Sequence, residues 1–122
     1  MLRDITKTSL AILLGGLIGA GAFAHPILQA SNPAQDASVQ APKEVRLTFS
    51  ENVIAKFSGL TIRDSSGALI ETANPSIDPN DKRQLVVPVA KALSPGAYEV
   101  DWHAVSADTH KVKGHFSFKV AQ

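Results

Sequence analysis

Two residues near the end of the chain have side chains and a spacing suited to metal binding. Asp108 and His110 are separated by a single residue in the segment SADTH. In an extended segment, residues i and i+2 project to the same side, so this carboxylate and this imidazole could converge on one ion. The pair alone is weak evidence, because a polar loop, or an aspartate that orients a histidine, would explain it equally well.

A third candidate ligand depends on what precedes it, because residues 1–24 have the composition of a secretory signal peptide. Arg3 and Lys7 make the start basic, and residues 10–24 form an apolar run without a charge. That run is shorter than the roughly 20 apolar residues that span a bilayer, so a cleaved signal explains it better than an uncleaved membrane anchor. We therefore expect a periplasmic protein.

The position of the cut decides the chemistry of His25. An Ala-Phe-Ala sequence ends at Ala24, and a cut there leaves a mature domain of residues 25–122 that begins with this histidine. Its α-amine and Nδ1 can then chelate one metal ion, and Pro26 has no amide hydrogen to lose, so it offers no competing ligand. A cut after Ala22 also fits the pattern, and would place the histidine third, where copper binding needs neither of the other two ligands.

The three residues together would offer three nitrogens and one oxygen. Such a planar set suits Cu(II), which also leads the divalent metals in affinity, whereas zinc, the alternative, prefers a tetrahedral arrangement. The chain has no cysteine, and its only methionine is Met1. Because Cu(I) favours sulfur ligands, we predict one Cu(II) per chain and no Cu(I) site.

The domain that must position these ligands is small and electrically balanced. Of the 12 Lys and Arg residues two lie in the signal segment, and of the 11 Asp and Glu residues one does, which leaves ten of each. This balance gives no indication of a nucleic-acid partner. A domain of this size has room for one hydrophobic core.

Alternation of apolar and polar residues predicts several short strands. The segments KEVRLTFSEN, PGAYEVDWHAV and KGHFSFKVA all have a period of two, and Pro88 places the strand QLVVPVA at an edge or a bulge. The pattern favours an all-β fold, an antiparallel β-sandwich of about seven strands. His103 and His115 fall on outward positions, where a solvated surface is the ordinary interpretation. The residues expected in the core are Val45, Leu47, Phe49, Val100, Trp102, Phe116 and Phe118.

Two long stretches, HPILQASNPAQDASVQAPKEVRLTFSENV and LSPGAYEVDWHAVSADTHKVKGHFSFKV, carry a family resemblance. Their specific parts are the processed amino-terminal histidine, Phe-Ser-Glu at 49–51, and Gly-x-Tyr-x-Val-x-Trp leading into Ser-x-Asp-x-His. The sequence resembles the CopC family of periplasmic copper-binding proteins. The resemblance implies a cupredoxin-like Greek-key β-barrel in which His25, Asp108 and His110 bind Cu(II). Glu51 is then either a neighbour or weak ligand of the metal, or an ordinary surface residue.

The chain departs from better known members of that family in one respect. Those proteins carry a methionine-rich loop with a histidine that binds Cu(I) at the opposite end of the barrel, and the region IRDSSGALIETANPSIDPNDKRQLVV has neither residue type. The resemblance implies a monomer that buffers or delivers copper, in homeostasis or resistance, with the inner-membrane copper transport protein CopD as its partner.

Two other classes of protein compete with this interpretation. An amino-terminal histidine beside a second histidine also resembles the copper brace of enzymes that cleave polysaccharides by oxidation. Those enzymes need an open coordination position and a broad face, commonly aromatic, whereas this chain has one Trp and one Tyr, and Asp108 would fill a position that oxygen needs. We therefore expect no enzyme activity. A metal-free Ig-like module is the third possibility, since the strand pattern alone would suffice for it.

Overall fold

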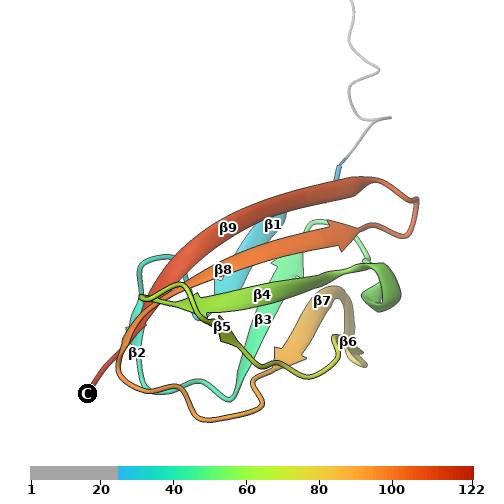
Figure 1. The fold of residues 1–122 in the computed structure, drawn as a ribbon. Helices are drawn as coiled ribbons and strands as arrows, with labels where there is room; N and C mark the ends of the chain where they lie inside the picture. Colours follow the sequence, from blue (N-terminus) through green and yellow to red (C-terminus); the bar gives the residue numbers. More distant parts are fainter. Residues whose placement is uncertain (1–24) are drawn as a thin grey trace, which may run out of the picture.

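The computed structural model describes residues 25–122, and the predicted signal segment, residues 1–24, lies outside the described residues. The domain is a sandwich of two sheets, with strand orders β1-β3-β7-β6 and β2-β9-β8-β4-β5 (Figure 1). The strands are β1 (Leu28–Asn32), β2 (Ser38–Val39), β3 (Glu44–Phe49), β4 (Gly59–Asp64), β5 (Leu69–Ile70), β6 (Ser76–Asp78), β7 (Asp81–Pro88), β8 (Gly96–Val105) and β9 (Lys111–Val120). The predicted all-β sandwich is confirmed, with short additional strands such as β2 and β5.

Neighbouring strands pair antiparallel, except that β2 runs parallel to β9. A 3-10 turn, η2 (Ala55–Phe57), precedes β4. Within residues 25–122, we find no helix with the length and apolar character needed to cross a membrane.

The core lies between the two sheets, where alternate residues of each strand are buried. Strand β8 shows the alternation most clearly, because every second side chain from Tyr98 to Ala104 is buried. The rings of Phe49 and Trp102 pack edge to face across the two sheets, with centroids 5.4 Å apart. All seven residues predicted for the core are buried, which confirms the predicted phase of β3, β8 and β9.

The edge position predicted for Pro88 was wrong. Strand β7 lies between β3 and β6 and is not an edge strand. Proline is tolerated there because it is the last residue of β7, beyond Val86, where the pairing with β6 begins. Its carbonyl oxygen accepts a hydrogen bond of 2.9 Å from the backbone N–H of Ala73.

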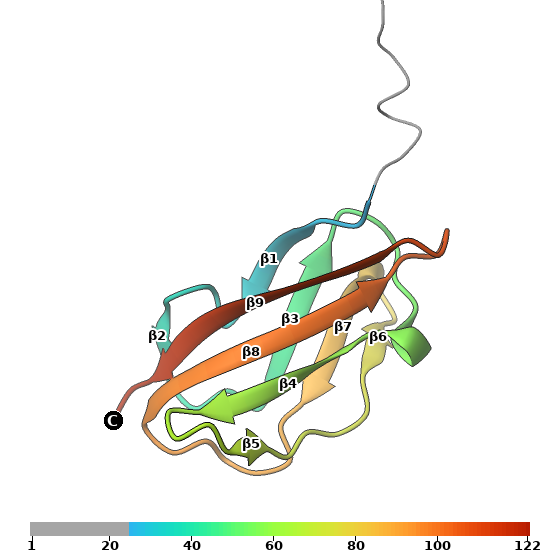
Figure 2. The ribbon, with the colours of Figure 1, turned by 45° about the horizontal axis from the view of Figure 1, so that its top comes forward.

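Three segments that are distant in the sequence meet at one end of the sandwich. The first described residues, the connection from β3 to η2, and the turn from β8 to β9 lie at this end, opposite the carboxyl terminus (Figure 2). This is the end at which the fold places the candidate metal ligands.

Candidate metal centre

Hydrogen bonds from backbone N–H groups hold the three segments of this end together. Ile27 and Ser50 are doubly linked, since the Ile27 N–H donates to Ser50 Oγ at 2.9 Å and the Ser50 N–H donates to the Ile27 carbonyl at 2.8 Å. On the other side, the Ala107 N–H donates to the Asn52 carbonyl at 2.9 Å. Glu51 therefore stands between the amino-terminal segment and the β8–β9 turn.

The same junction brings the two histidines into contact. The imidazole rings of His25 and His110 meet edge to face, with centroids 4.9 Å apart and planes inclined by 65°. Pro26 is buried, which anchors the segment next to His25, while the His25 side chain itself is exposed. The fold thus places next to each other two imidazoles that are far apart in the sequence.

Asp108 and His110 are also neighbours, although not in the way the sequence suggested. The carboxylate Oδ2 of Asp108 lies 3.2 Å from Nδ1 of His110. We expected an extended segment, but the chain forms a tight turn closed by a 2.8 Å hydrogen bond from the Thr109 N–H to the Ser106 carbonyl. Thr109 has a φ of 72°, a left-handed conformation that is costly for a β-branched residue. The turn, and not an extended strand, brings the two side chains together.

Ser106 organises this turn, and sequence reasoning assigned it no role. Its side chain is completely buried. The hydroxyl donates a hydrogen bond to Oδ1 of Asp108 and accepts one of 3.1 Å from the backbone N–H of His110. The available signal was a serine where the strand alternation breaks, a position at which serine hydroxyls commonly bond to nearby backbone.

The turn also sets the charge of the carboxylate. The hydrogen bond from Ser106, and then the nearby His110, lower the pKa of Asp108 below its ordinary value of 3.8. Asp108 is therefore an anion at neutral pH, as a metal ligand must be.

Two buried polar atoms at this end have no hydrogen-bond partner among the described residues, namely Oε2 of Glu51 and Nδ1 of His110. The His110 nitrogen is close to Asp108, but the two groups are not aligned for a hydrogen bond. An unpaired buried polar atom costs free energy, and such atoms cluster where an ion or ligand is bound. Carboxylate oxygen and imidazole nitrogen are donors that Cu(II) and Zn(II) accept.

These contacts are pairwise, because between residues 25 and 122 no three His, Asp or Glu side chains are arranged as they stand to hold a metal ion. The predicted ligand set includes an α-amine, which His25 lacks as long as a peptide bond joins it to the preceding residue. Cleavage would supply this missing donor. The donor chemistry fits copper, and cleavage is the step that would complete the set.

The other two histidines do not form a second cluster. His103 leans across β4, where its ring would touch a Cβ built on Gly59 at 3.4 Å. His115 instead lines a shallow hollow with Leu28 and Gln35 on the opposite side of β9. The two rings therefore point to different neighbours, and both are exposed, as the sequence predicted.

The CopC domain family matches residues 28–121, and the chain therefore belongs to the CopC family. Protein YobA of Escherichia coli (strain K12) is 43% identical over 115 residues, which cover 93% of each chain. Copper resistance protein C of Escherichia coli is 41% identical over 119 residues, covering 90% of this chain and 94% of that one. The crystal structure of PcoC, described as a methionine-rich copper resistance protein from Escherichia coli, matches with a TM-score of 0.72 and 36% identity, covering 80% of this chain and 99% of that one.

Proposed function

We propose that this protein binds one Cu(II) ion in the periplasm, through the α-amine and Nδ1 of His25, the carboxylate of Asp108 and the imidazole of His110. The contact between the two imidazoles, with the carboxylate 3.2 Å from the second one, is the observation that supports the proposal most directly. Membership of the CopC family, with relatives named as copper resistance proteins, supports a copper-related function.

Each residue contributes a different property to this proposed site. His25 supplies a chelate ring once the bond after Ala24 is cut. Asp108 brings a negative charge, because its pKa is lowered. Glu51, whose buried Oε2 has no partner within residues 25–122, would be stabilised by a nearby divalent cation, and we propose it as a neighbour or weak ligand of the metal.

The proposed site is specific for Cu(II), and we expect the protein not to bind Cu(I). Cu(I) favours thioether and thiolate ligands, and this chain has no cysteine and no methionine beyond Met1. The relative PcoC, by contrast, is described as methionine rich. We propose that this protein carries Cu(II) as a monomer and exchanges it with an inner-membrane transport protein of the CopD type.

We propose a carrier and not an oxidative enzyme. A copper enzyme that activates oxygen needs an open position on the metal, and Asp108 is held beside His110 by Ser106. A carboxylate fixed at this distance would fill such a position.

The proposal is tested by the copper affinity of the mature protein and its variants. Replacing His110 by Ala should weaken Cu(II) binding by more than about a hundredfold, since even supporting residues of metal sites cost about 10- to 100-fold when removed. Affinity is measured by competition with a chromophoric chelator, with His103→Ala as the matched control.

The intact mass of the secreted protein shows where the signal peptide is cleaved. It should correspond to a chain that begins at His25. A mature chain beginning at Phe23 whose copper affinity does not change in the His110 variant would overturn the proposed ligand set. In that case His25 would bind copper from the third position, without help from the β8–β9 turn.

A further inference from the structure

An apolar hollow of about 500 Å³ lies on the outer face of the five-stranded sheet, beside the candidate metal centre. Its wall consists mainly of side chains from η2, β8, the β8–β9 turn and β9. The wall includes Phe57, His103, Val105, Thr109, Lys111 and Val112. Thr109 separates Asp108 from His110, so anything bound in the hollow is one residue away from two proposed copper ligands.

The aromatic side of the hollow is held in an exposed position by its neighbours. Phe57 is 54% exposed, although it is the last residue of η2, a turn that is hydrogen-bonded to β8 through the neighbouring Ser58. Ser58 makes this attachment, because its hydroxyl donates to the Ile54 carbonyl at 2.7 Å and accepts a 3.0 Å bond from the Val105 N–H. A large apolar side chain fixed in solvent beside a hollow is typical of an interaction site.

Positive charge surrounds this apolar centre. Lys111 forms part of the wall, the ammonium group of Lys56 lies 5.7 Å from the centroid of the Phe57 ring, and Lys113 is the strand partner of His103. Within residues 25–122, none of the three lysines pairs with a carboxylate. The domain has equal numbers of basic and acidic residues, so this local excess is a property of their arrangement and not of the composition.

Two carboxylates lie near these lysines, and within residues 25–122 neither forms an ion pair with them. Asp108 lies at the turn, but its two oxygens face Ser106 and His110. Asp101 is on the same face, two residues along β8, where its strand partner is His115. The hollow therefore presents an apolar surface with unpaired ammonium groups around it.

We propose that this hollow docks an acidic segment of a partner protein, with an apolar side chain of the partner against Phe57 and its carboxylates against Lys56, Lys111 and Lys113. Complementary charge steers such encounters and an apolar anchor holds them. The docking does not depend on copper. That the docked partner exchanges copper with His110 and its neighbours is a separate consequence, which rests on the proposed function.

A direct test uses the copper-free protein and short blocked peptides, followed by two-dimensional NMR of the labelled chain. The peptide has a central leucine with two glutamates on each side, and the controls carry lysines or glutamines in place of the glutamates. The acidic peptide should shift the amide signals of Phe57, His103, Thr109 and Lys111 and bind more weakly as salt is raised. Equal binding of all three peptides, or shifts confined to other parts of the chain, would overturn the proposal.

Charge reversal locates the contact. The double variant Lys111→Glu, Lys113→Glu should weaken binding of the acidic peptide by about tenfold or more. Lys119→Glu is the matched control, because it lies on the same strand and the same face at the opposite end of β9, and it should leave the affinity within about twofold. Equal losses in both variants would mean a diffuse charge effect without a docking site.

Two further measurements separate this proposal from its competitors. Docking that survives in the His110→Ala variant, which lacks the proposed copper site, would support the hollow whether or not copper binds as proposed. A second copy of the chain is the competing occupant, since exposed Leu69 lies near Glu71 at the far end of the domain. Sedimentation showing that the protein self-associates, with Phe57→Ser restoring the monomer, would overturn docking of a separate partner.

Discussion

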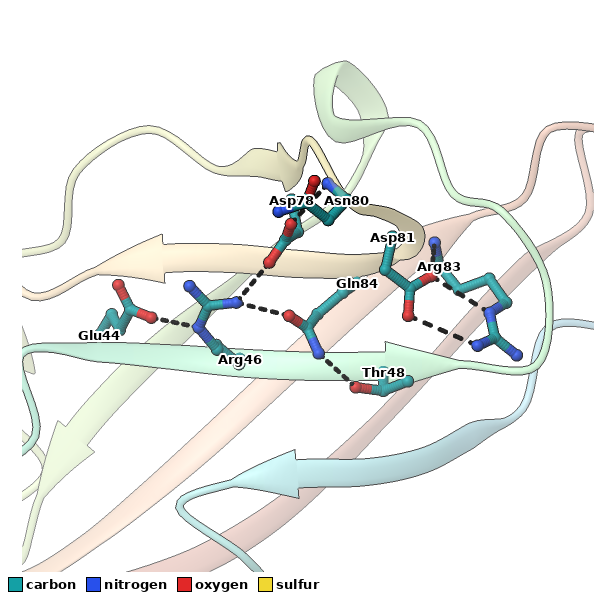
Figure 3. A network of polar contacts seen from close by, with 8 residues as sticks. All are labelled: Glu44, Arg46, Thr48, Asp78, Asn80, Asp81, Arg83 and Gln84. Atoms are coloured by element: carbon teal, nitrogen blue, oxygen red, sulfur yellow. Dashed lines mark hydrogen bonds and ion pairs between the residues drawn. The ribbon is translucent and has the colours of Figure 1, made fainter.

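The two outer faces of the sandwich differ in whether their charged side chains form ion pairs. On the four-stranded sheet, Arg46 lies at the centre of a network in which its guanidinium group contacts Glu44, Asp78 and Gln84 (Figure 3). The side-chain amide of Gln84 in turn donates a 3.0 Å hydrogen bond to Oγ1 of Thr48. The charges of Glu44, Arg46 and Asp78 are thus paired with one another.

On the five-stranded sheet the charges around the hollow are left unpaired. Lys56, Lys111 and Lys113 have no carboxylate partner within residues 25–122, and Phe57 is exposed beside Lys56. We infer from this comparison that the two faces have different roles. Side chains on the first face contribute to folding, whereas those on the second contribute little to folding and are available to a partner.

The largest change in the free energy of unfolding is expected for a substitution on the inner side of the five-stranded sheet. If the outer side contributes little to stability, the packing of the inner side must supply it. A Cβ added at Gly114 would lie 2.5 Å from Cζ2 of Trp102, whose ring is fixed in the core. Gly114→Ala should therefore cost about 1 to 3 kcal/mol of unfolding free energy, as overpacked cores do. Denaturant unfolding measures this cost.

Gly59→Ala is the control on the outer side of the same sheet, since its added Cβ would meet His103 and Pro75 only at 3.4 Å or more. It should change the unfolding free energy by less than Gly114→Ala does. Equal losses would contradict the view that the inner side alone carries the packing of this sheet.

A matched pair of substitutions compares the two outer faces directly. Arg46→Met removes the centre of the network and leaves Asp78 without its 2.7 Å partner, which should cost about 1 to 2 kcal/mol, because hydrogen bonds to charged groups are worth more than neutral ones. Lys113→Met should stay within about 0.5 kcal/mol, as surface substitutions usually do. Thermal and urea unfolding of both variants would show the difference, and similar losses would remove the distinction between the faces.

The smallest expected effect is a change in acid sensitivity. Hydrogen bonds from the Asn80 N–H and then from Arg46 lower the pKa of Asp78 below its ordinary 3.8. A carboxyl group whose folded-state pKa is lowered stabilises the fold above the unfolded value and loses that contribution as the pH falls below 3.8. Asp78→Asn should therefore be less stable than the parent at neutral pH and should approach it in acid.

The measurement is urea unfolding at several pH values, with Asp101→Asn on the other face as the control. Asp101 is the matched control because it makes no side-chain hydrogen bond or ion pair within residues 25–122, so its replacement removes no such contact. If both variants changed the pH dependence equally, the network around Arg46 would not be the cause.

Much of the fold could be predicted from local pattern. The alternation in β3, β8 and β9 identified their buried faces, because the side-chain period of a strand depends only on neighbouring residues. The place of β7 inside its sheet could not be predicted in this way. Strand order depends on which segments pair across the domain, and Pro88 is compatible with a central strand only because of where the β6 pairing lies.

The candidate site could likewise be predicted from local sequence only in part. The residue types and spacing of Asp108 and His110 identified them as a pair, but the turn that joins them depends on the buried hydroxyl of Ser106 and on the left-handed backbone of Thr109. Sequence spacing carries no information about a left-handed residue of this type, because a threonine rarely adopts that conformation.

By itself, then, the sequence determined the chemistry that this protein can perform: nitrogen and oxygen ligands without sulfur, a balanced charge and strands with one apolar face. Only the tertiary structure decided where that chemistry lies. It placed His25 against His110, inserted Glu51 between the segments that carry them, and brought Lys56 and Lys111 to the hollow beside Phe57. The physical reason is that composition and periodicity are local properties of a chain, whereas a binding site or a docking surface is made by residues that only packing brings together.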